Sequence, residues 1–220
     1  GFKVGTDAVL LGAWADIFKS ASILEIGTGT GVIAMMMAQR AQASITAVEF
    51  DDNAASQAKY NFQRCSFGRL DVEQDSIQDF AGKCQVKFDH VVCNPPFFQF
   101  SSKPNSDTLH KAKHTDSLEP SELIACSARL SNENGRLSIV IPFSDQDYWI
   151  EIAQTEGFYP NQKLLVRPAP EFDYKRVLIE FGKSEELCKE QEITLEEGEG
   201  GNRTYTSQFQ EMMKDYYIKF

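Results

Sequence analysis

Short apolar segments alternate with amphipathic ones along this chain, and this alternation restricts its fold more than any other feature. Apolar runs with the length and composition of buried strands occupy residues 22–26, 44–50, 70–74, 87–93, 135–142, 164–167 and 176–181. Between the first three of these runs, segment 32–40 is predicted to be an apolar helix, and segment 51–65 a second helix with acidic residues at its amino end. Strands that alternate with helices form βαβ units. The sequence therefore predicts an α/β fold with a mostly parallel sheet.

The length of 220 residues, with 42% apolar and 25% charged residues, indicates one domain spanning 1–220. Thr6 or Asp7 is expected to cap a first helix that continues to about Phe18. Residues 101–117 have no apolar periodicity, and a loop of that length is usually functional or disordered. Two interpretations follow, a substrate lid and a disordered segment without function. Residues 184–200 hold seven Glu and one Lys, which predicts an acidic hairpin or linker.

A glycine-rich stretch follows the first predicted strand and opens a helix. It reads Glu25-Ile26-Gly27-Thr28-Gly29-Thr30-Gly31. Glycines let a backbone approach a ligand closely, and the amides of the following helix point toward it. The dinucleotide pattern G-x-G-x-x-G is absent, because the sixth position counted from Gly27 is Val32. An acidic residue at the strand end favours a cationic ligand instead.

Two further carboxylates stand where predicted strands end. Glu49 ends the second strand, where a carboxylate can accept both hydroxyls of a ribose. Phe50 beside it can cover an adenine ring, and Asp75 at the end of the third strand can accept from an adenine amino group. Open α/β sheets bind ligands at the carboxyl ends of their strands. Glu49, Phe50 and Asp75 are therefore expected at one site with the glycine loop.

The fourth predicted strand runs into Asn94-Pro95-Pro96-Phe97. The two prolines fix φ, remove two backbone donors and hold the preceding residues extended, so this loop is stiff. Asn94 supplies an amide with one acceptor and two donors, and Phe97 supplies a ring face. The combination suits a planar group that carries an NH2. A Pro-Pro turn that only closes a strand has the same pattern.

The set of strand-end residues resembles class I S-adenosylmethionine-dependent methyltransferases. That resemblance implies a Rossmann-like, mostly parallel seven-stranded sheet flanked by helices, with S-adenosyl-L-methionine as the cofactor. It also implies two groups of site residues. The cofactor-binding group is Glu25, Gly27, Gly29, Gly31, Glu49, Phe50 and Asp75, and the catalytic group is Asn94, Pro95, Pro96 and Phe97.

The Asn-Pro-Pro-Phe motif resembles that of enzymes which methylate an amino or amide nitrogen in a planar group. Three further stretches resemble the bacterial tRNA(Val) adenine-37 N6-methyltransferase family: residues 2–7 (FKVGTD), 113–118 (KHTDSL) and 205–217. The resemblance implies methylation of adenine N6 in tRNA, with Gly5, Thr6 and Asp7 over the methionine end of the cofactor. Guanine-N2 methylation of rRNA and glutamine-N5 methylation of a protein are the alternatives, followed by a cofactor-binding module without catalysis.

The net charge of −10 is unusual for an RNA-binding protein, because RNA affinity comes largely from phosphate contacts. We therefore expect a locally basic rim around the Asn94 loop. Its expected members are Lys103, Lys111, Lys113, His114, Lys175, Arg167, Arg176 and Arg203.

The apolar runs and the cysteines show which further partners the sequence does not predict. No apolar run reaches the roughly 18 residues of a membrane helix. The five cysteines include no CxxC pair, so neither a metal site nor a disulfide framework is predicted. These features predict a cytoplasmic enzyme without membrane or metal partners, and we assume a monomer.

Overall fold

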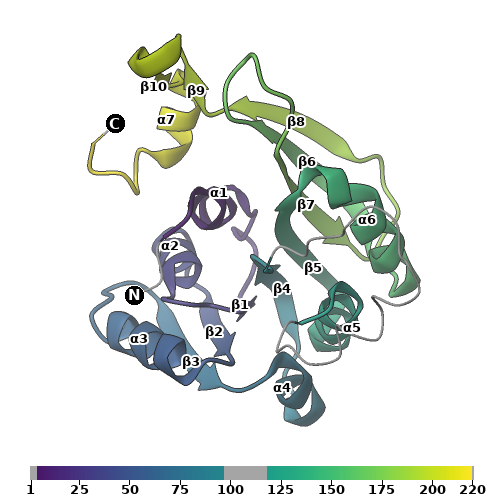
Figure 1. Cartoon of the computed structure of the whole chain (residues 1–220). Helices are drawn as coiled ribbons and strands as arrows, with labels where there is room; N and C mark the ends of the chain where they lie inside the picture. Colours follow the sequence, from purple (N-terminus) through teal and green to yellow (C-terminus); the bar gives the residue numbers. More distant parts are fainter. Residues whose placement is uncertain (1–3, 97–117, 220) are drawn as a thin grey trace, which may run out of the picture.

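An eight-stranded sheet lies between two layers of helices in the computed structural model, which describes residues 4–96 and 118–219 (Figure 1). The strands in sheet order are β3 (Arg69–Gln74), β2 (Ser44–Glu49), β1 (Ser22–Ile26), β4 (Phe88–Cys93), β5 (Ser131–Pro142), β7 (Arg176–Gly182), β6 (Tyr159–Arg167) and β8 (Lys189–Thr194). Only β7 runs antiparallel to its neighbours. All other pairs are parallel, so the carboxyl ends of seven strands share one edge.

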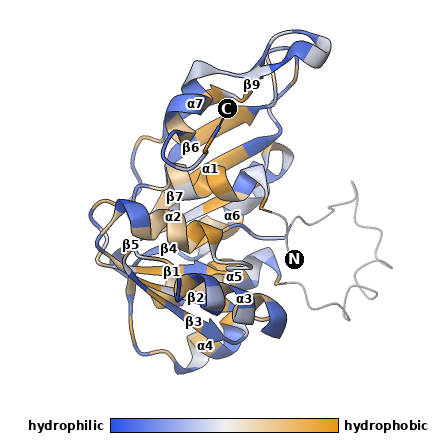
Figure 2. Ribbon diagram, turned by 90° about the vertical axis from the view of Figure 1, so that its left-hand side faces the viewer, coloured by the Kyte–Doolittle hydropathy of each residue, from blue (hydrophilic) through white to orange (hydrophobic). Residues whose placement is uncertain are grey.

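Alternating side chains on the strands explain the layers, because successive residues of a strand point to opposite faces. In β1, Ile23 joins one hydrophobic cluster and Leu24 joins the other. The first cluster packs against α1 (Thr6–Trp14), α2 (Val32–Arg40), α3 (Asp52–Phe62) and α7 (Ser207–Met213). The second packs against α4 (Ile77–Lys83), α5 (Pro120–Leu130) and α6 (Gln146–Thr155). Figure 2 shows hydrophobic residues along the central strands and hydrophilic residues on α3 and α4.

The α/β class and the mostly parallel sheet are as predicted, but the expected seven strands are one too few. The eighth strand, β8, comes from the acidic stretch 184–200, which we had interpreted as a hairpin or linker. It pairs in parallel with β6, from Gln162 opposite Lys189 to Arg167 opposite Thr194. Only Ile193 of β8 is buried. Charged residues suit this position because an edge strand with charged side chains resists pairing with another chain.

Two helices differ from the prediction. The first helix ends at Trp14 rather than near Phe18, and its N-cap is Gly5 without a side-chain bond, so neither Thr6 nor Asp7 caps it. Helix α4 was not predicted, although its N-cap Ser76 accepts from the amide of Asp79 in the usual capping geometry. The short β9 (Glu196–Glu197) and β10 (Thr204–Tyr205) pair with each other after β8.

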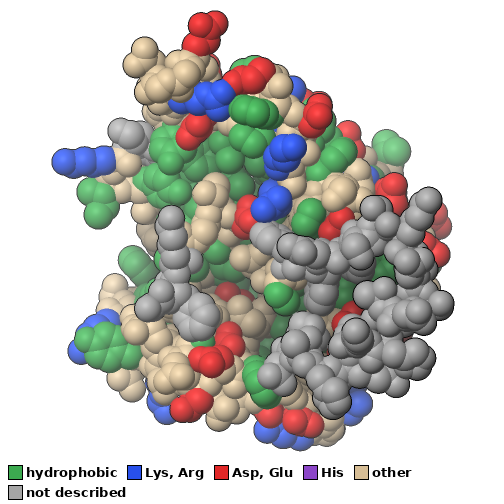
Figure 3. Space-filling model, in the orientation of Figure 1, with side chains coloured by type: hydrophobic (Ala, Val, Ile, Leu, Met, Phe, Trp, Pro, Cys, Tyr) green, Lys and Arg blue, Asp and Glu red, His purple; other side chains and the backbone are tan. Residues whose placement is uncertain are grey.

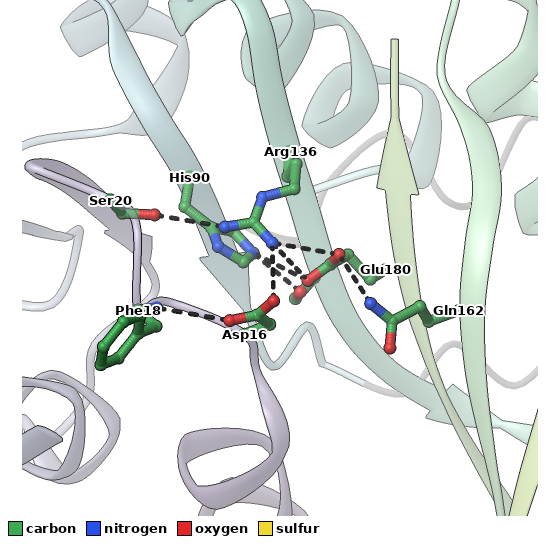
Figure 4. A network of polar contacts seen from close by, with 8 residues as sticks. Asp16, Phe18, Ser20, His90, Arg136, Gln162 and Glu180 are labelled. Atoms are coloured by element: carbon green, nitrogen blue, oxygen red, sulfur yellow. Dashed lines mark hydrogen bonds and ion pairs between the residues drawn. The ribbon is translucent and has the colours of Figure 1, made fainter. Parts of the chain in front are cut away.

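A buried polar network ties the central strands to the segment after α1 (Figure 4). Arg136 of β5 donates to Glu180 of β7 at 3.3 Å and lies 3.5 Å from Asp16. His90 of β4 lies 2.8 Å from Ser138 Oγ, and burial lowers the pKa of His90 to about 3, so its ring is neutral. Burial also raises the pKa of Glu180. These groups fix the strands side by side below the edge where the predicted site residues lie.

Candidate active site

Two adjoining cavities open at the carboxyl edge of the sheet. The first, of about 500 Å³, lies over β1, β2, β3 and β4 and is lined by Glu49, Phe50 and Asp75, among others. The second, of about 360 Å³, lies under the start of α1 and is lined by Gly5, Asp7 and Gly29, among others. Four residues line both cavities: Gly27, Asn94, Pro95 and Pro96. The Asn-Pro-Pro loop therefore stands where the two cavities meet.

The glycine loop connects β1 to α2 with three left-handed residues. Gly27, Gly29 and Gly31 have φ of +71°, +55° and +85°. A Cβ on Gly27 or Gly29 would meet no atom of the described residues within 4 Å, whereas one on Gly31 would lie 2.4 Å from Phe62 Cε1. Gly31 also lines neither cavity. Gly27 and Gly29 thus leave open space for a ligand, while Gly31 is required by packing against α3.

Glu25 lies beneath this loop and not in either cavity. Its Oε2 accepts from the hydroxyl of Thr28 at 2.5 Å and from the amide of Ala34 at 3.1 Å. Burial raises the pKa of Glu25 to about 8. Its Oε1 has no hydrogen-bond partner among the described residues. The side chain therefore holds the loop against the start of α2.

Glu49 lines the first cavity and joins two loops at its edge. Its Oε2 accepts from the amide of Gly29 at 2.8 Å, and its Oε1 accepts from the amide of Asp51 at 3.0 Å. Asp51 in turn caps α3 by accepting from Ala54 at 2.8 Å. Each carboxylate oxygen has a second lone pair, so Glu49 can still accept hydrogen bonds from a ligand.

Asp75 and Phe50 also line the first cavity. The ring of Phe50 is 60% exposed. Asp75 Oδ1 accepts from the amide of Ser76 at 3.0 Å, and its Oδ2 lies 2.6 Å from Lys83 Nζ. Sequence reasoning missed Lys83 and the lining residues of α4. The Ser76-x-x-Asp79 capping pattern is the signal that could have located that helix.

Asn94, Pro95 and Pro96 follow β4, whose last residue Cys93 is paired with Ile26 of β1. These residues belong to no helix or strand, and Pro95 is buried while Pro96 is exposed. Within the described ranges no hydrogen bond engages the Asn94 side chain, so its amide is available to a ligand. Phe97, predicted to stack on the substrate, lies outside the described residues, as does the predicted lid 101–117.

The amino-terminal residues form a wall of the second cavity. Gly5 and Asp7 line it and Thr6 does not. Asp7 Oδ2 lies 3.0 Å from Arg176 Nε at the start of β7. This ion pair ties the beginning of α1 to the middle of the sheet.

Half of the predicted basic rim lies outside the described residues: Lys103, Lys111, Lys113 and His114. Of the other half, Arg167 pairs with Glu192 at 2.7 Å, Arg176 pairs with Asp7, and Arg203 pairs with Glu171. Carboxylates therefore accompany three of these four cations, and only Lys175 has no ion pair within the described residues.

Comparison with known proteins identifies the family. The family profile named "Methyltransferase small domain" matches residues 4–148. A tRNA1(Val) (adenine(37)-N6)-methyltransferase of Trichodesmium erythraeum is 39% identical over 99% of this chain and 92% of its own length. One from Bacteroides fragilis is 38% identical over 99% of this chain and 91% of its own length.

The chain belongs to the tRNA1(Val) (adenine(37)-N6)-methyltransferase family. Its membership confirms the resemblance carried by the three flanking stretches and the Asn-Pro-Pro-Phe motif. Among solved structures, a predicted O-methyltransferase, Atu636 of Agrobacterium tumefaciens, superposes with a TM-score of 0.72 at 17% identity, over 95% of this chain and 96% of that one. That likeness confirms the class I methyltransferase fold expected for this family.

The residues of the first cavity fit S-adenosyl-L-methionine, the cofactor of class I methyltransferases. Its volume falls within the roughly 300–1,000 Å³ of small-molecule sites. Gly27 lines this cavity without a side chain to fill it, and Glu49 and Asp75 supply acceptors there. No group of three His, Cys, Asp or Glu residues in the described ranges is arranged to hold a metal ion. Every helix of residues 4–96 and 118–219 is too short or too polar to cross a membrane.

Proposed function

We propose that this protein methylates N6 of an adenine in tRNA, at position 37 of tRNA1(Val), as the names of its relatives describe. The observation that carries the proposal is the wall that the two cavities share. Asn94 and Pro95 stand there, between the first cavity and the space under α1 that would take the methionine end of the cofactor. Because tRNA is a cytoplasmic substrate, the proposal places the enzyme in the cytoplasm.

Bound S-adenosyl-L-methionine supplies the methyl group. Glu49 would hold the ribose hydroxyls, because it keeps free lone pairs while Gly29 and Asp51 fix its orientation. Phe50 would cover the cofactor adenine, and Asp75 would accept from its amino group. Glu25 supports the glycine loop from below, and Gly5 and Asp7 would enclose the methionine end.

The Asn-Pro-Pro loop acts on the target base. The lone pair of an exocyclic amino group is delocalised into the adenine ring, so the nitrogen is a weak nucleophile. Acceptance of its two N–H hydrogens by the Asn94 side-chain oxygen and the Pro95 carbonyl favours a pyramidal nitrogen with an available lone pair. Holding the amino nitrogen in line with the methyl group provides much of the rate acceleration. The nitrogen gains the methyl carbon as the bond from that carbon to the sulfonium sulfur breaks and leaves a neutral thioether, and the nitrogen then releases one proton to solvent. The base must first leave its stack to reach the loop.

Transfer of label from tritiated S-adenosylmethionine tests the proposal. The enzyme is offered total tRNA, rRNA, release factor and a tRNA1(Val) transcript, and the modified nucleoside is identified after digestion. We expect N6-methyladenosine in tRNA1(Val), and a transcript with guanine at position 37 should accept no label. Label in guanine of rRNA or in a protein glutamine would support one of the alternatives and end this proposal.

A further inference from the structure

The loop between β6 and β7, residues 168–175, lies at the same edge of the sheet as Asn94. Strand β6 runs in the direction of β4 and β5, because β7 is antiparallel to both of its neighbours. Backbone hydrogen bonds hold the loop at both ends, from Lys175 N to Val166 O at 2.8 Å and from Glu196 N to Pro168 O at 2.9 Å. Ala169 in its middle is fully buried. The loop is therefore a fixed part of this edge.

Two aromatic residues of the loop have different surroundings. Tyr174 packs on Phe143 with ring centroids 5.3 Å apart, and Arg167 lies 5.0 Å from its ring centre. Phe172 is 43% exposed and belongs to neither hydrophobic cluster. Arg203 lies 5.1 Å from its ring centre. Packing thus accounts for Tyr174, while the ring of Phe172 is partly exposed beside the guanidinium group of Arg203.

Cations extend from this loop toward the active site. Lys175 and Arg176 follow Phe172 in the chain, and Arg176 contacts Asp7 at the wall of the second cavity. The other half of the edge, where the cofactor space lies, carries Glu49 and Asp75. Figure 3 shows Lys and Arg side chains among hydrophobic and acidic ones on the upper part of this face. This half of the edge therefore offers cations, although carboxylates such as Glu171 and Asp173 lie among them.

The ion pairs of these arginines do not prevent a contact with phosphate. Glu171 and Glu192, the partners of Arg203 and Arg167, have side chains that are 51% and 52% exposed. The arginine side chains are less exposed, 25% for Arg203 and 31% for Arg167. Because each carboxylate is half exposed, water screens both pairs, and a phosphate can replace the carboxylate at small cost.

We propose that loop 168–175 is a platform for the RNA strand beside the target adenine, in which a base stacks on Phe172 and phosphates contact Arg203 and Lys175. The platform rests on the proposed function, since it concerns the tRNA of the same reaction. Base stacking on an aromatic ring and phosphate contacts with cations are the two contributions that single-stranded RNA offers a protein.

Binding of a tRNA1(Val) transcript to the full chain, measured by filter retention across a salt series, tests the platform. Phe172→Ala should raise the Kd about tenfold, the order expected for one lost base stack. Phe172→Trp should keep the Kd near that of the wild type. Arg203→Gln should make the slope of log Kd against log salt shallower by about 0.7–0.9. The Kd for S-adenosylmethionine and the melting temperature should stay unchanged in all three.

Matched controls come from the opposite edge, where α3 leads back to the start of β3. Phe67 is 45% exposed there, and Arg64 stacks on Tyr60 at 3.5 Å. Phe67→Ala and Arg64→Gln should bind the transcript as the wild type does. Equal binding by Phe172→Ala, Arg203→Gln and the wild type would overturn the platform, as would an equal loss in both controls.

The same variants separate this inference from the proposed function. Wild-type transfer to tRNA with unaltered binding in the platform variants would reject the platform alone. Transfer to another RNA would reject the tRNA proposal. The platform would then stand if Phe172→Ala bound that RNA more weakly than the wild type, and it would be rejected if the two bound it equally. Transfer only to protein would reject both.

Discussion

The carboxylate of Glu49 accepts a hydrogen bond of 2.8 Å from the backbone amide of Gly29 and so joins the end of β2 to the glycine loop after β1. Its second oxygen holds the amide of Asp51, the N-cap of α3. One side chain therefore positions two loops at the rim of the first cavity. Its replacement should affect both the loops and the ligand they surround.

Glu49→Gln should weaken binding of S-adenosylmethionine by about 1–3 kcal/mol, the range for a lost hydrogen bond to a charged group. A glutamine has one acceptor oxygen, and its NH2 would face one of the two backbone N–H donors. Isothermal titration calorimetry measures the change. The exposed Glu73 on β3 provides the control, and Glu73→Gln should bind the cofactor as the wild type does. Unchanged affinity in Glu49→Gln would contradict the role given to Glu49.

Asn94→Ala should lower kcat for methyl transfer by about 10²–10³, the usual loss for one preorganised hydrogen-bonding group at a reacting centre. The Kd for S-adenosylmethionine should stay within a few-fold, because the cofactor contacts lie on other strands. Single-turnover transfer and cofactor titration give the two values. Asn134→Ala, an exposed change at the amino end of β5, is the matched control. Loss of cofactor binding together with transfer would show that Asn94 acts mainly on the cofactor site.

Gly31→Ala and Gly29→Ala should fail in different ways. Each substitution puts a side chain at positive φ, at a cost of about 1–2 kcal/mol in folding free energy. Gly31→Ala adds a contact of 2.4 Å with Phe62, so it should lose about 1–3 kcal/mol more. Phe62→Leu should recover part of that loss. Gly29→Ala meets no atom of the described residues, and its larger effect should be on cofactor affinity.

Urea unfolding and cofactor titration of both glycine variants provide the comparison. If Gly31→Ala retained wild-type stability, the packing explanation for this glycine would be wrong.

The raised pKa of Glu25, about 8 against an ordinary 4.5, makes stability depend on pH. Between these two values the folded protein keeps the proton and the unfolded chain releases it, so the free energy of unfolding falls as pH rises from about 4.5 to about 8. Above that range the loss is complete and amounts to several kcal/mol, at ~1.36 kcal/mol per pKa unit. Glu25→Gln has no proton to release and should lack this contribution.

Urea unfolding at pH 5 and pH 9 measures the difference between wild type and Glu25→Gln, with Glu73→Gln as the exposed control. A pH dependence that is the same in all three proteins would falsify the account of Glu25.

The Arg136–Glu180 pair should show strong coupling. Glu180→Leu leaves the largely buried guanidinium group of Arg136 with only the exposed Asp16 as its carboxylate partner, and it should cost about 3 kcal/mol in folding free energy. Arg136→Met in the same chain removes that charge, so the double variant should be more stable than Glu180→Leu alone. A double-mutant cycle by urea unfolding measures the coupling. Additive costs would mean that the two side chains do not depend on each other.

The sequence alone determined the α/β class, the order of the strand-end residues and the family. These depend on local properties: apolar runs of strand length, glycines before a helix, and the stiff Asn-Pro-Pro loop. Each of these features can be recognised from the residues of one short segment. The fold class and the identification could therefore be predicted without a structure.

Only the tertiary structure decided which residues share a cavity and what each one contacts. Glu25 lies below the loop because its carboxylate bonds with Thr28 and Ala34, and Gly31 is fixed by a ring from α3. Strand β8 forms from an acidic segment because β6 offers an unpaired edge. The pairing of Arg176 with Asp7 joins residues 169 positions apart. Such contacts depend on how distant segments pack, and no periodicity within one segment records them.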